Sequence, residues 1–375
     1  MISSPVEARM TEYLYQKASI AGLPLSGTFE LTPLCNMNCK MCYVRLDKEV
    51  QQAIAPLRTA EEWLSLAQSA KQAGMLYLLL TGGEPFTHPQ FREILEGLHQ
   101  LGLVISLNSN GTMINEETVQ WLKDCPPSRI NITLYGASND TYARLCRNPD
   151  GFSQAARAVS LLKQAGIPVK LNCSLTPHNA DDLLDIFQFA RSNEVNIDVA
   201  TYMFPPLRRD ASLTGSNDRL SPEEAARYSA LSDYLLLGKE RFLAKGCELT
   251  LPGDPDDACS DVGEGIRCRA GKCSFWITWT GDMSPCGMVP GTENCNVFQR
   301  PFEDVWHCVR QAAAEIRLPV KCTGCSLAKT CRACAAMVYT ESGNYHRVPA
   351  YRCEMTKAYP QQYHLLVRQL EEELI

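Results

Sequence analysis

The feature that most constrains the fold of this chain is a regular alternation of short apolar runs with helical patterns between residues 26 and 202. Each apolar run has the length of a strand and is followed by a loop and a segment with helical spacing. Parallel strands need such crossovers, so the alternation predicts a parallel sheet covered by helices. Curled on itself, this α/β sheet forms a partial (β/α)6 TIM-like barrel. We expect its six strands at residues 26–32, 76–81, 103–107, 129–135, 169–175 and 195–202.

The expected helices lie between and after these strands. Thr59 with Glu62 three residues later is typical of a capping box and predicts a helix to about residue 73. Ser221, Pro222 and Glu224 predict a second capped helix, to about residue 237. Other helices are expected at residues 89–101, 116–123, 153–165 and 181–192.

The composition is that of an ordinary globular protein. The chain has 375 residues, of which 45% are hydrophobic and 21% are charged. A net charge of -6 disfavours nucleic-acid binding, which needs a clustered basic face. The sequence has neither an apolar run of about 20 residues nor an export-like start, so we expect a cytoplasmic protein without a membrane span.

The number of cysteines, eighteen, is the exception. A reducing cytoplasm disfavours a disulfide framework, so clustered cysteines indicate metal or catalytic roles. Eleven of them fall into recognisable spacings. The others are expected mostly as small buried hydrophobic residues, and they are Cys125, Cys146, Cys173, Cys247, Cys259, Cys295 and Cys308.

The unusual loops of the first region all follow an expected strand. Cys35, Cys39 and Cys42 form a CxxxCxxC loop after the first strand. Residues 81–85, 108–111 and 135–138 follow the next three strands. The carboxyl ends of barrel strands meet at one mouth, where active sites lie, so we expect a site built from these loops.

The three cysteines of the first loop are soft thiolate donors of the kind that hold iron–sulfur clusters. A [4Fe-4S] cluster has four irons, so three cysteines leave one iron without a protein ligand. A small chelating molecule can bind there through an amine and a carboxylate. The same spacing is compatible with half of a zinc site.

This loop resembles the signature of the radical S-adenosylmethionine (SAM) superfamily, in which the residue before the last cysteine is usually aromatic. That position is Met41 here, and the aromatic Tyr43 comes after the last cysteine. Gly82, Gly83 and Glu84 match the family's GGE motif, which contacts the methionyl amine of SAM. Glycines allow close backbone approach and a carboxylate accepts from an ammonium group. A lone GGE is usually a turn, but here it follows the second strand of the expected barrel.

The resemblance implies further SAM contacts. Thr133 and the later Arg144 are similar to the family's fourth-strand segment and its Arg, although Tyr135 stands where the family has Asp. An Asn in a turn more often bonds its own backbone than a ligand. The weaker candidates are Asn108, Asn110 and Asn172.

The cysteine spacing after residue 247 resembles a SPASM domain. Twelve residues separate Cys268 from Gly281 and four separate Gly281 from Cys286. The rest of the pattern has one residue fewer than the family before Cys334 and comprises Cys322, Cys325, Cys331, Cys334 and Cys353. The resemblance implies two auxiliary [4Fe-4S] clusters.

Carried over position by position, the resemblance assigns seven cysteines to these clusters. One cluster takes Cys268, Cys286 and Cys334, and the other takes Cys322, Cys325, Cys331 and Cys353. The first needs a fourth ligand, which is Cys273 or Cys259, or it has an open iron. By spacing alone, the run from Cys322 to Cys334 could instead form a zinc knuckle.

We therefore expect five parts along the chain. These are a helical lead at 1–25, the barrel at 26–203, a linker and helix at 204–246, the auxiliary-cluster domain at 247–358 and a docking helix at 359–375. The auxiliary domain has few long periodic segments, as expected where metal holds a fold together.

The resemblance implies an enzyme that cleaves SAM reductively to a 5'-deoxyadenosyl radical and abstracts a substrate hydrogen. SPASM relatives most often modify peptides, so we expect a cross-linked (thioether or C–C) or oxidised residue in a peptide or protein, with flavodoxin or ferredoxin as reductant. Alternatives are formylglycine formation, radical epimerisation, and oxidation of a small molecule or tetrapyrrole. Sulfatase maturases carry an Asp base where this chain has Gly287. A non-enzymatic iron–sulfur or zinc scaffold would leave the GGE motif without a ligand.

Overall fold

The computed structural model describes residues 5–206, 218–246, 263–323 and 325–372. Its centre is an eight-stranded sheet with the order β6-β5-β4-β3-β2-β1-β7-β8, parallel throughout except that β8 runs antiparallel to β7. The six expected strands are present, with ends that differ by a few residues. The strands are β1 (Ser26–Glu30), β2 (Tyr77–Thr81), β3 (Val104–Ser109), β4 (Arg129–Thr133), β5 (Val169–Ser174), β6 (Asn196–Ala200), β7 (Ser274–Ile277) and β8 (Met283–Ser284).

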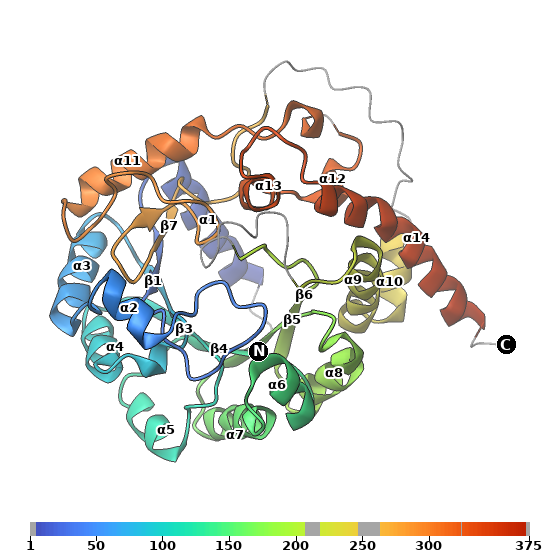
Figure 1. Ribbon diagram of the computed structural model, residues 1–375, viewed down its shortest axis with the longest axis horizontal. Helices are drawn as coiled ribbons and strands as arrows, with labels where there is room; N and C mark the ends of the chain where they lie inside the picture. Colours follow the sequence, from blue (N-terminus) through green and yellow to red (C-terminus); the bar gives the residue numbers. More distant parts are fainter. Residues whose placement is uncertain (1–4, 207–217, 247–262, 324, 373–375) are drawn as a thin grey trace.

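Helices surround the curved sheet (Figure 1). The capping box expected at Thr59 is formed, since the Glu62 amide donates to Thr59 Oγ1 at 3.2 Å and the Thr59 amide donates to Glu62 at 2.7 Å. Ser221 and Glu224 form the second box. The helices up to residue 246 are α1 (Pro5–Ala21), α2 (Lys48–Ile54), α3 (Ala60–Gln72), α4 (Phe91–Gln100), α5 (Glu116–Leu122), α6 (Asn139–Cys146), α7 (Gly151–Gln164), α8 (Leu183–Ser192), α9 (Pro222–Leu237) and α10 (Lys239–Gly246).

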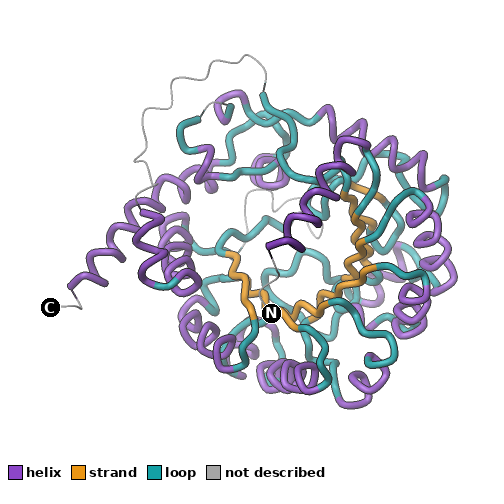
Figure 2. The backbone as a smooth tube through the Cα atoms, turned by 180° about the vertical axis from the view of Figure 1, so that it is seen from behind, coloured by secondary structure: helices purple, strands orange, loops and turns teal. Residues whose placement is uncertain are grey.

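The two faces of the sheet differ in chemistry. Alternate strand residues such as Phe29, Leu80 and Leu107 are fully buried in the apolar core under the helices. The opposite face, around which the strands curve in Figure 2, carries polar residues such as Asn108 and Asn131. There Asn131 of β4 donates to Asn108 Oδ1 of β3 at 2.8 Å. The inside of the barrel therefore offers hydrogen-bonding groups.

The cysteine-rich region continues the barrel sheet. β7 pairs in parallel with β1, in a register that places Ser26 opposite Ser274. Behind β7 lies α11 (Phe302–Glu315), whose Trp306 Nε1 donates to the Gly22 carbonyl at 2.9 Å. The helix α11 is a long periodic segment that the sequence analysis did not anticipate. The two regions thus share one sheet and part of one core.

The last helix begins earlier than expected. The predicted start at residue 359 is wrong, because α14 runs unbroken over Ala350–Glu372 and contains Pro360. Cys353 therefore lies in the first turn of this helix, and α14 packs against α9. Before it come α12 (Ala328–Cys331) and α13 (Ala335–Ser342).

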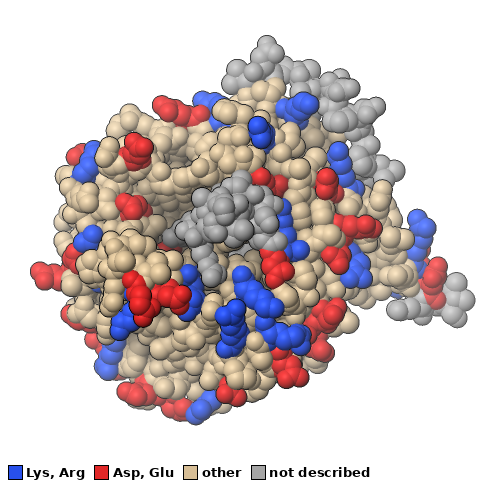
Figure 3. Space-filling view, viewed as in Figure 1, with Lys and Arg blue, Asp and Glu red and all other residues tan. Residues whose placement is uncertain are grey.

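Two surface properties follow from the described residues. None of the described helices has the length and apolar character needed to cross a membrane. On the face drawn in Figure 3, acidic and basic side chains are interspersed, with one group of basic side chains below the central grey segment.

Candidate cofactor site and auxiliary cysteines

The CxxxCxxC loop is held from two sides. The Met37 amide points at Cys35 Sγ at 3.4 Å, and the Arg45 amide points at Cys42 Sγ at 3.3 Å. On the other side, the Asn38 amide donates to the Cys146 carbonyl of α6 at 3.1 Å. These hydrogen bonds fix the loop backbone, and so they define the positions of the three cysteines.

Gly82 and Gly83 are required by packing against this loop. The Gly83 amide donates to the Thr32 carbonyl at 2.7 Å, which brings the two backbones side by side. A Cβ atom on Gly83 would lie 2.4 Å from the Leu34 carbonyl oxygen, and one on Gly82 would lie 2.6 Å from that of Thr32. Only glycine fits such a close approach. The glycines of the GGE motif therefore join the second loop to the cysteine loop.

Glu84 faces the third loop and is fully buried. Its carboxylate accepts from Ser109 Oγ at 2.9 Å and from the Asn110 amide at 2.7 Å. Burial raises the pKa of Glu84 to about 7, although these hydrogen bonds oppose the shift. Glu84 does not line the cavity described next, and its expected contact with a SAM amine stays a prediction. Glu84 holds the backbone N–H of Asn110, and the side-chain Nδ2 of Asn110 reaches Cys35 Sγ at 3.7 Å.

The ends of β1 to β6 surround a cavity of about 210 Å3, here called the mouth cavity. Six candidates other than cysteines line it, together with Met41, Ser109, Tyr135, Ser174 and Met203, which were not expected as ligand contacts. Ser174 and Met203 carry no motif that could have identified them. The six candidates that line the cavity are Tyr43, Gly82, Gly83, Asn108, Asn110 and Thr133.

Two further candidates do not line the mouth cavity. Arg144 on α6 donates to the His178 carbonyl at 3.3 Å and to Thr141 Oγ1 at 3.2 Å. Asn172 lies on β5, opposite Thr133 in the register. The roles of both residues as SAM contacts come from the resemblance alone and stay predictions.

The thiols of the first loop have the properties of desolvated soft donors. Burial raises the pKa of Cys35 to about 12. A hydrogen bond with the Cys146 thiol, and then burial, raise the pKa of Cys39. Cys146 was expected only as a buried hydrophobic residue, and no sequence motif indicates this contact. Metal binding deprotonates such thiols, so three soft donors on one loop fit an iron–sulfur cluster.

The structure sorts the other candidate cysteines into two groups. Burial raises the pKa of Cys286, and the charges of Cys334 and Cys268 raise it further, so these three thiols form the first auxiliary group. Burial, followed by the charges of three neighbouring cysteines, raises the pKa of Cys322 to about 11. All four line one cavity of about 540 Å3 and form the second auxiliary group, Cys322, Cys325, Cys331 and Cys353.

This sorting disfavours the zinc-knuckle alternative. Cys334 directly precedes α13, and it interacts electrostatically with Cys268 and Cys286. Cys273 is fully buried against α1, where Ser19 Oγ lies 3.0 Å from its sulfur. Cys259 lies outside the described residues.

Comparison with known proteins agrees with this geometry. A family model described as the radical SAM superfamily matches residues 29–190. The AdoMet-dependent heme synthase of Methanosarcina barkeri is 24% identical over 87% of this chain and 95% of that protein. The antilisterial bacteriocin subtilosin biosynthesis protein AlbA of Bacillus subtilis is 25% identical over 76% of this chain and 60% of that protein.

A solved structure shows the same fold. Streptococcus suis SuiB bound to precursor peptide SuiA has a TM-score of 0.64 at 18% identity, over 93% of this chain and 81% of that chain. The fold, the cysteine loop and the family match all lead to one assignment. The chain is therefore an enzyme built on a radical SAM domain at residues 29–190, with a cysteine-rich C-terminal region.

Proposed function

We propose that this enzyme cleaves SAM reductively and uses the resulting radical to abstract a hydrogen from a residue of a peptide substrate. The product is a thioether or C–C cross-link, or an oxidised residue. One observation carries the proposal: Cys35, Cys39 and Cys42 share the mouth cavity with Gly82, Gly83 and the polar ends of three strands.

In this proposal the residues of the chain hold and orient the reactants. Cys35, Cys39 and Cys42 would hold a [4Fe-4S] cluster, which when bound supplies one electron to the sulfonium of SAM. Asn108, Thr133 and Ser174 offer hydrogen-bonding groups to the nucleoside and to the substrate. The inner barrel face would exclude bulk water, which a carbon radical requires.

A peptide substrate is supported by the polar inner face of the barrel. Asn108 lies opposite Asn131 in the register and Asn172 lies opposite Thr133, so three neighbouring strands carry carboxamides, which can both donate to and accept from peptide groups. The names of AlbA and of the SuiB complex refer to a bacteriocin and a precursor peptide. Formylglycine formation is disfavoured, because a Cβ on Gly287 would lie 2.8 Å from the Trp276 ring and leaves no room for an acid.

Oxidation of a tetrapyrrole is the second candidate. The M. barkeri protein named a heme synthase matches this chain over 95% of its own length, so its match includes the cysteine-rich region. Radical epimerisation of a peptide would use the same mouth cavity. Identifying the substrate distinguishes the peptide reactions from oxidation of a tetrapyrrole.

The auxiliary groups would hold two further [4Fe-4S] clusters. The second group supplies four thiolates to one cavity, and the first supplies three. Because Cys273 bonds α1, we propose that Cys259 completes the first cluster or that one of its irons is open. Such clusters can take an electron from the substrate, and a flavodoxin or ferredoxin would reduce the enzyme in the cytoplasm.

Anaerobic reconstitution tests the proposal. We expect about twelve irons per chain and 5'-deoxyadenosine after reduction in the presence of SAM. Cys35→Ala should lower 5'-deoxyadenosine formation by at least about a thousandfold, since two thiolates do not retain a cluster. Cys353→Ala should leave about eight irons and spare SAM cleavage. Intact SAM after reduction of the iron-loaded wild type would refute the function.

The substrate class is tested by product analysis. The enzyme is incubated with SAM and reductant beside peptides encoded near its gene, and in parallel beside a tetrapyrrole. A peptide that loses about two mass units per cross-link supports the first candidate. A changed tetrapyrrole absorption spectrum with unmodified peptides would support the second.

A further inference from the structure

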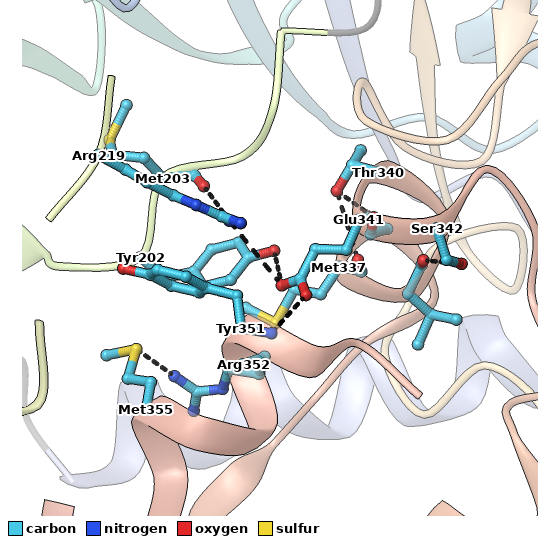
Figure 4. Close-up of polar contacts among 12 residues, drawn as sticks. Tyr202, Met203, Arg219, Met337, Thr340, Glu341, Ser342, Tyr351, Arg352 and Met355 are labelled. Carbon is cyan, nitrogen blue, oxygen red and sulfur yellow. Dashed lines mark hydrogen bonds and ion pairs between the residues drawn. The ribbon is translucent and has the colours of Figure 1, made fainter. Parts of the chain in front are cut away.

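Four side chains from separate segments form a buried polar cluster between the barrel and the cysteine-rich region (Figure 4). Tyr202 follows β6, Arg219 precedes α9, Glu341 lies in α13, and Tyr351 lies at the start of α14. We call these residues the Glu341 cluster. The side chains of Glu341 and Arg219 are only 4% and 9% exposed. Charged groups buried to this degree are rare unless they are paired.

Both oxygens of the Glu341 carboxylate are used. Tyr202 Oη donates to one at 2.7 Å, and the Tyr351 backbone amide donates to the other at 3.0 Å. Arg219 Nη1 lies 3.9 Å from the carboxylate. The Arg219 guanidinium also stacks 3.6 Å from the Tyr351 ring centre. One carboxylate thus fixes a strand end, a loop and two helices at once.

The cluster connects three functional places. Met203, the residue after Tyr202, lines the mouth cavity. Cys334 directly precedes α13, which carries Glu341. Cys353 lies two residues after Tyr351, in the first turn of α14. The carboxylate is therefore a short structural link from the cavity wall to one proposed ligand of each auxiliary cluster.

Stability alone is a weak reason for such a cluster. Buried ion pairs lose much of their attraction to desolvation, and well-packed apolar residues often replace them without loss of stability. Directional bonds, in contrast, fix the relative placement of the elements that they join. Burial, and then the Glu341 charge, raise the pKa of Tyr202, so its hydroxyl stays a donor to the carboxylate.

We propose that Glu341 is a positioning residue that sets the mouth cavity in a fixed relation to both auxiliary cysteine groups. This inference rests on the proposed radical SAM function. Glu341 does not line the mouth cavity and acts through Tyr202 and Tyr351. Its loss leaves SAM cleavage possible but releases the cavity wall from the auxiliary region. SAM cleavage is then no longer coupled to the arrangement of the auxiliary region.

The test is Glu341→Gln in the fully reconstituted enzyme. The amide cannot accept the two hydrogen bonds in their present arrangement, because one of its arms is a donor. We expect an unchanged iron content and roughly a fivefold increase in the rate of 5'-deoxyadenosine formation without substrate. We also expect altered electron paramagnetic resonance signals from the reduced auxiliary clusters. A merely structural ion pair would lower thermal stability and leave those signals unchanged.

The matched control is Glu371→Gln, which makes the same chemical change at an exposed site near the end of α14. It should leave both readouts at their wild-type values. If Glu341→Gln does not fold, Tyr202→Phe removes one hydrogen bond only and should shift the same readouts in the same direction. Wild-type readouts in these cluster variants would overturn the inference. Intact SAM with the iron-loaded wild type would instead overturn the proposed function and, with it, the inference.

Discussion

The two cysteine-bearing regions differ in what holds their thiols in place. The CxxxCxxC loop is bonded to the GGE loop and to α6, and its surroundings belong to the main hydrophobic core. The auxiliary cysteines lie beside a small apolar cluster of Ile266, Ala270, Ala313, Leu318, Ala335 and Val338. Such a small core offers little burial energy. We infer that the first site is built by the protein and that the second is completed by its metal.

Removal of iron should produce the largest difference in stability between the two regions. In the iron-free protein, we expect amide exchange around Cys322, Cys325 and Cys331 to accelerate by about a thousandfold, because metal binding there is also folding energy. The amides of β2 to β5 should keep their protection. Hydrogen–deuterium exchange with mass spectrometry measures both. Equal loss in the two regions would show that the barrel site also needs its metal to fold.

The second largest effect should come from adding a methyl group where the GGE loop contacts the cysteine loop. Gly83→Ala places Cβ 2.4 Å from a backbone oxygen that cannot move aside, so we expect a loss of about 3 kcal/mol in unfolding free energy. Gly265→Ala in the auxiliary region is the control, since its nearest contact would be 3.8 Å away. Urea unfolding of the two iron-free variants measures the difference. A tolerated Gly83→Ala would mean that the junction is loose.

The buried carboxylate of Glu84 gives the barrel a distinctive pH dependence. Its pKa is raised to about 7 in the folded protein, so the folded state binds its proton more tightly than the unfolded state does. This contribution to stability is complete below about pH 4.5, falls as the pH rises, and is lost above about pH 7. The loss is up to roughly 3 kcal/mol.

Glu84→Gln tests this pH dependence. The neutral amide does not titrate, so the variant should lack the part of the stability decline that lies between about pH 5 and about pH 7. Urea unfolding of both iron-free proteins at several pH values gives the difference. Parallel curves would show that Glu84 titrates alike in the folded and unfolded states.

The smallest effect should come from Arg144. The resemblance to the family assigns it to SAM, whereas the structure bonds it to His178 and Thr141 outside the mouth cavity. We expect Arg144→Ala to change the dissociation constant for SAM by less than about twofold. Thr133→Val, at the cavity, should weaken it by roughly fivefold, as expected for one lost hydrogen bond. Equilibrium binding to reconstituted protein compares them, and the reverse ranking would restore Arg144 as a SAM ligand.

Much of the barrel could be predicted because its signals are local. Apolar runs gave the six strands, and Thr59 with Glu62 gave a capping box that the structure confirms. The start of α14 could not be predicted, because Pro360 suggests a break that tertiary packing overrides. The pairing of β7 with β1 was missed for a different reason. A short strand that pairs with a partner some 250 residues earlier leaves no periodic signal of its own.

The site shows the same division between local and distant information. Motifs found Cys35, Gly82 and Gly83, but not that the glycines pack on the cysteine loop or that Glu84 faces Asn110. Those facts depend on how two loops meet in space. Likewise, Glu341 belongs to no motif, and its role depends on segments brought together only by folding.

The ladder between β1 and β7 has a mechanical consequence. It joins Ser26–Phe29 to Ser274–Ile277 through main-chain hydrogen bonds. The C-terminal helix α14 packs against α9. The described parts of the chain are thereby joined at two places, the β1–β7 pairing and the packing of α14 on α9. Swinging one region away from the other would require tearing backbone bonds, so any opening for substrate has to come from loops rather than from a hinge between the regions.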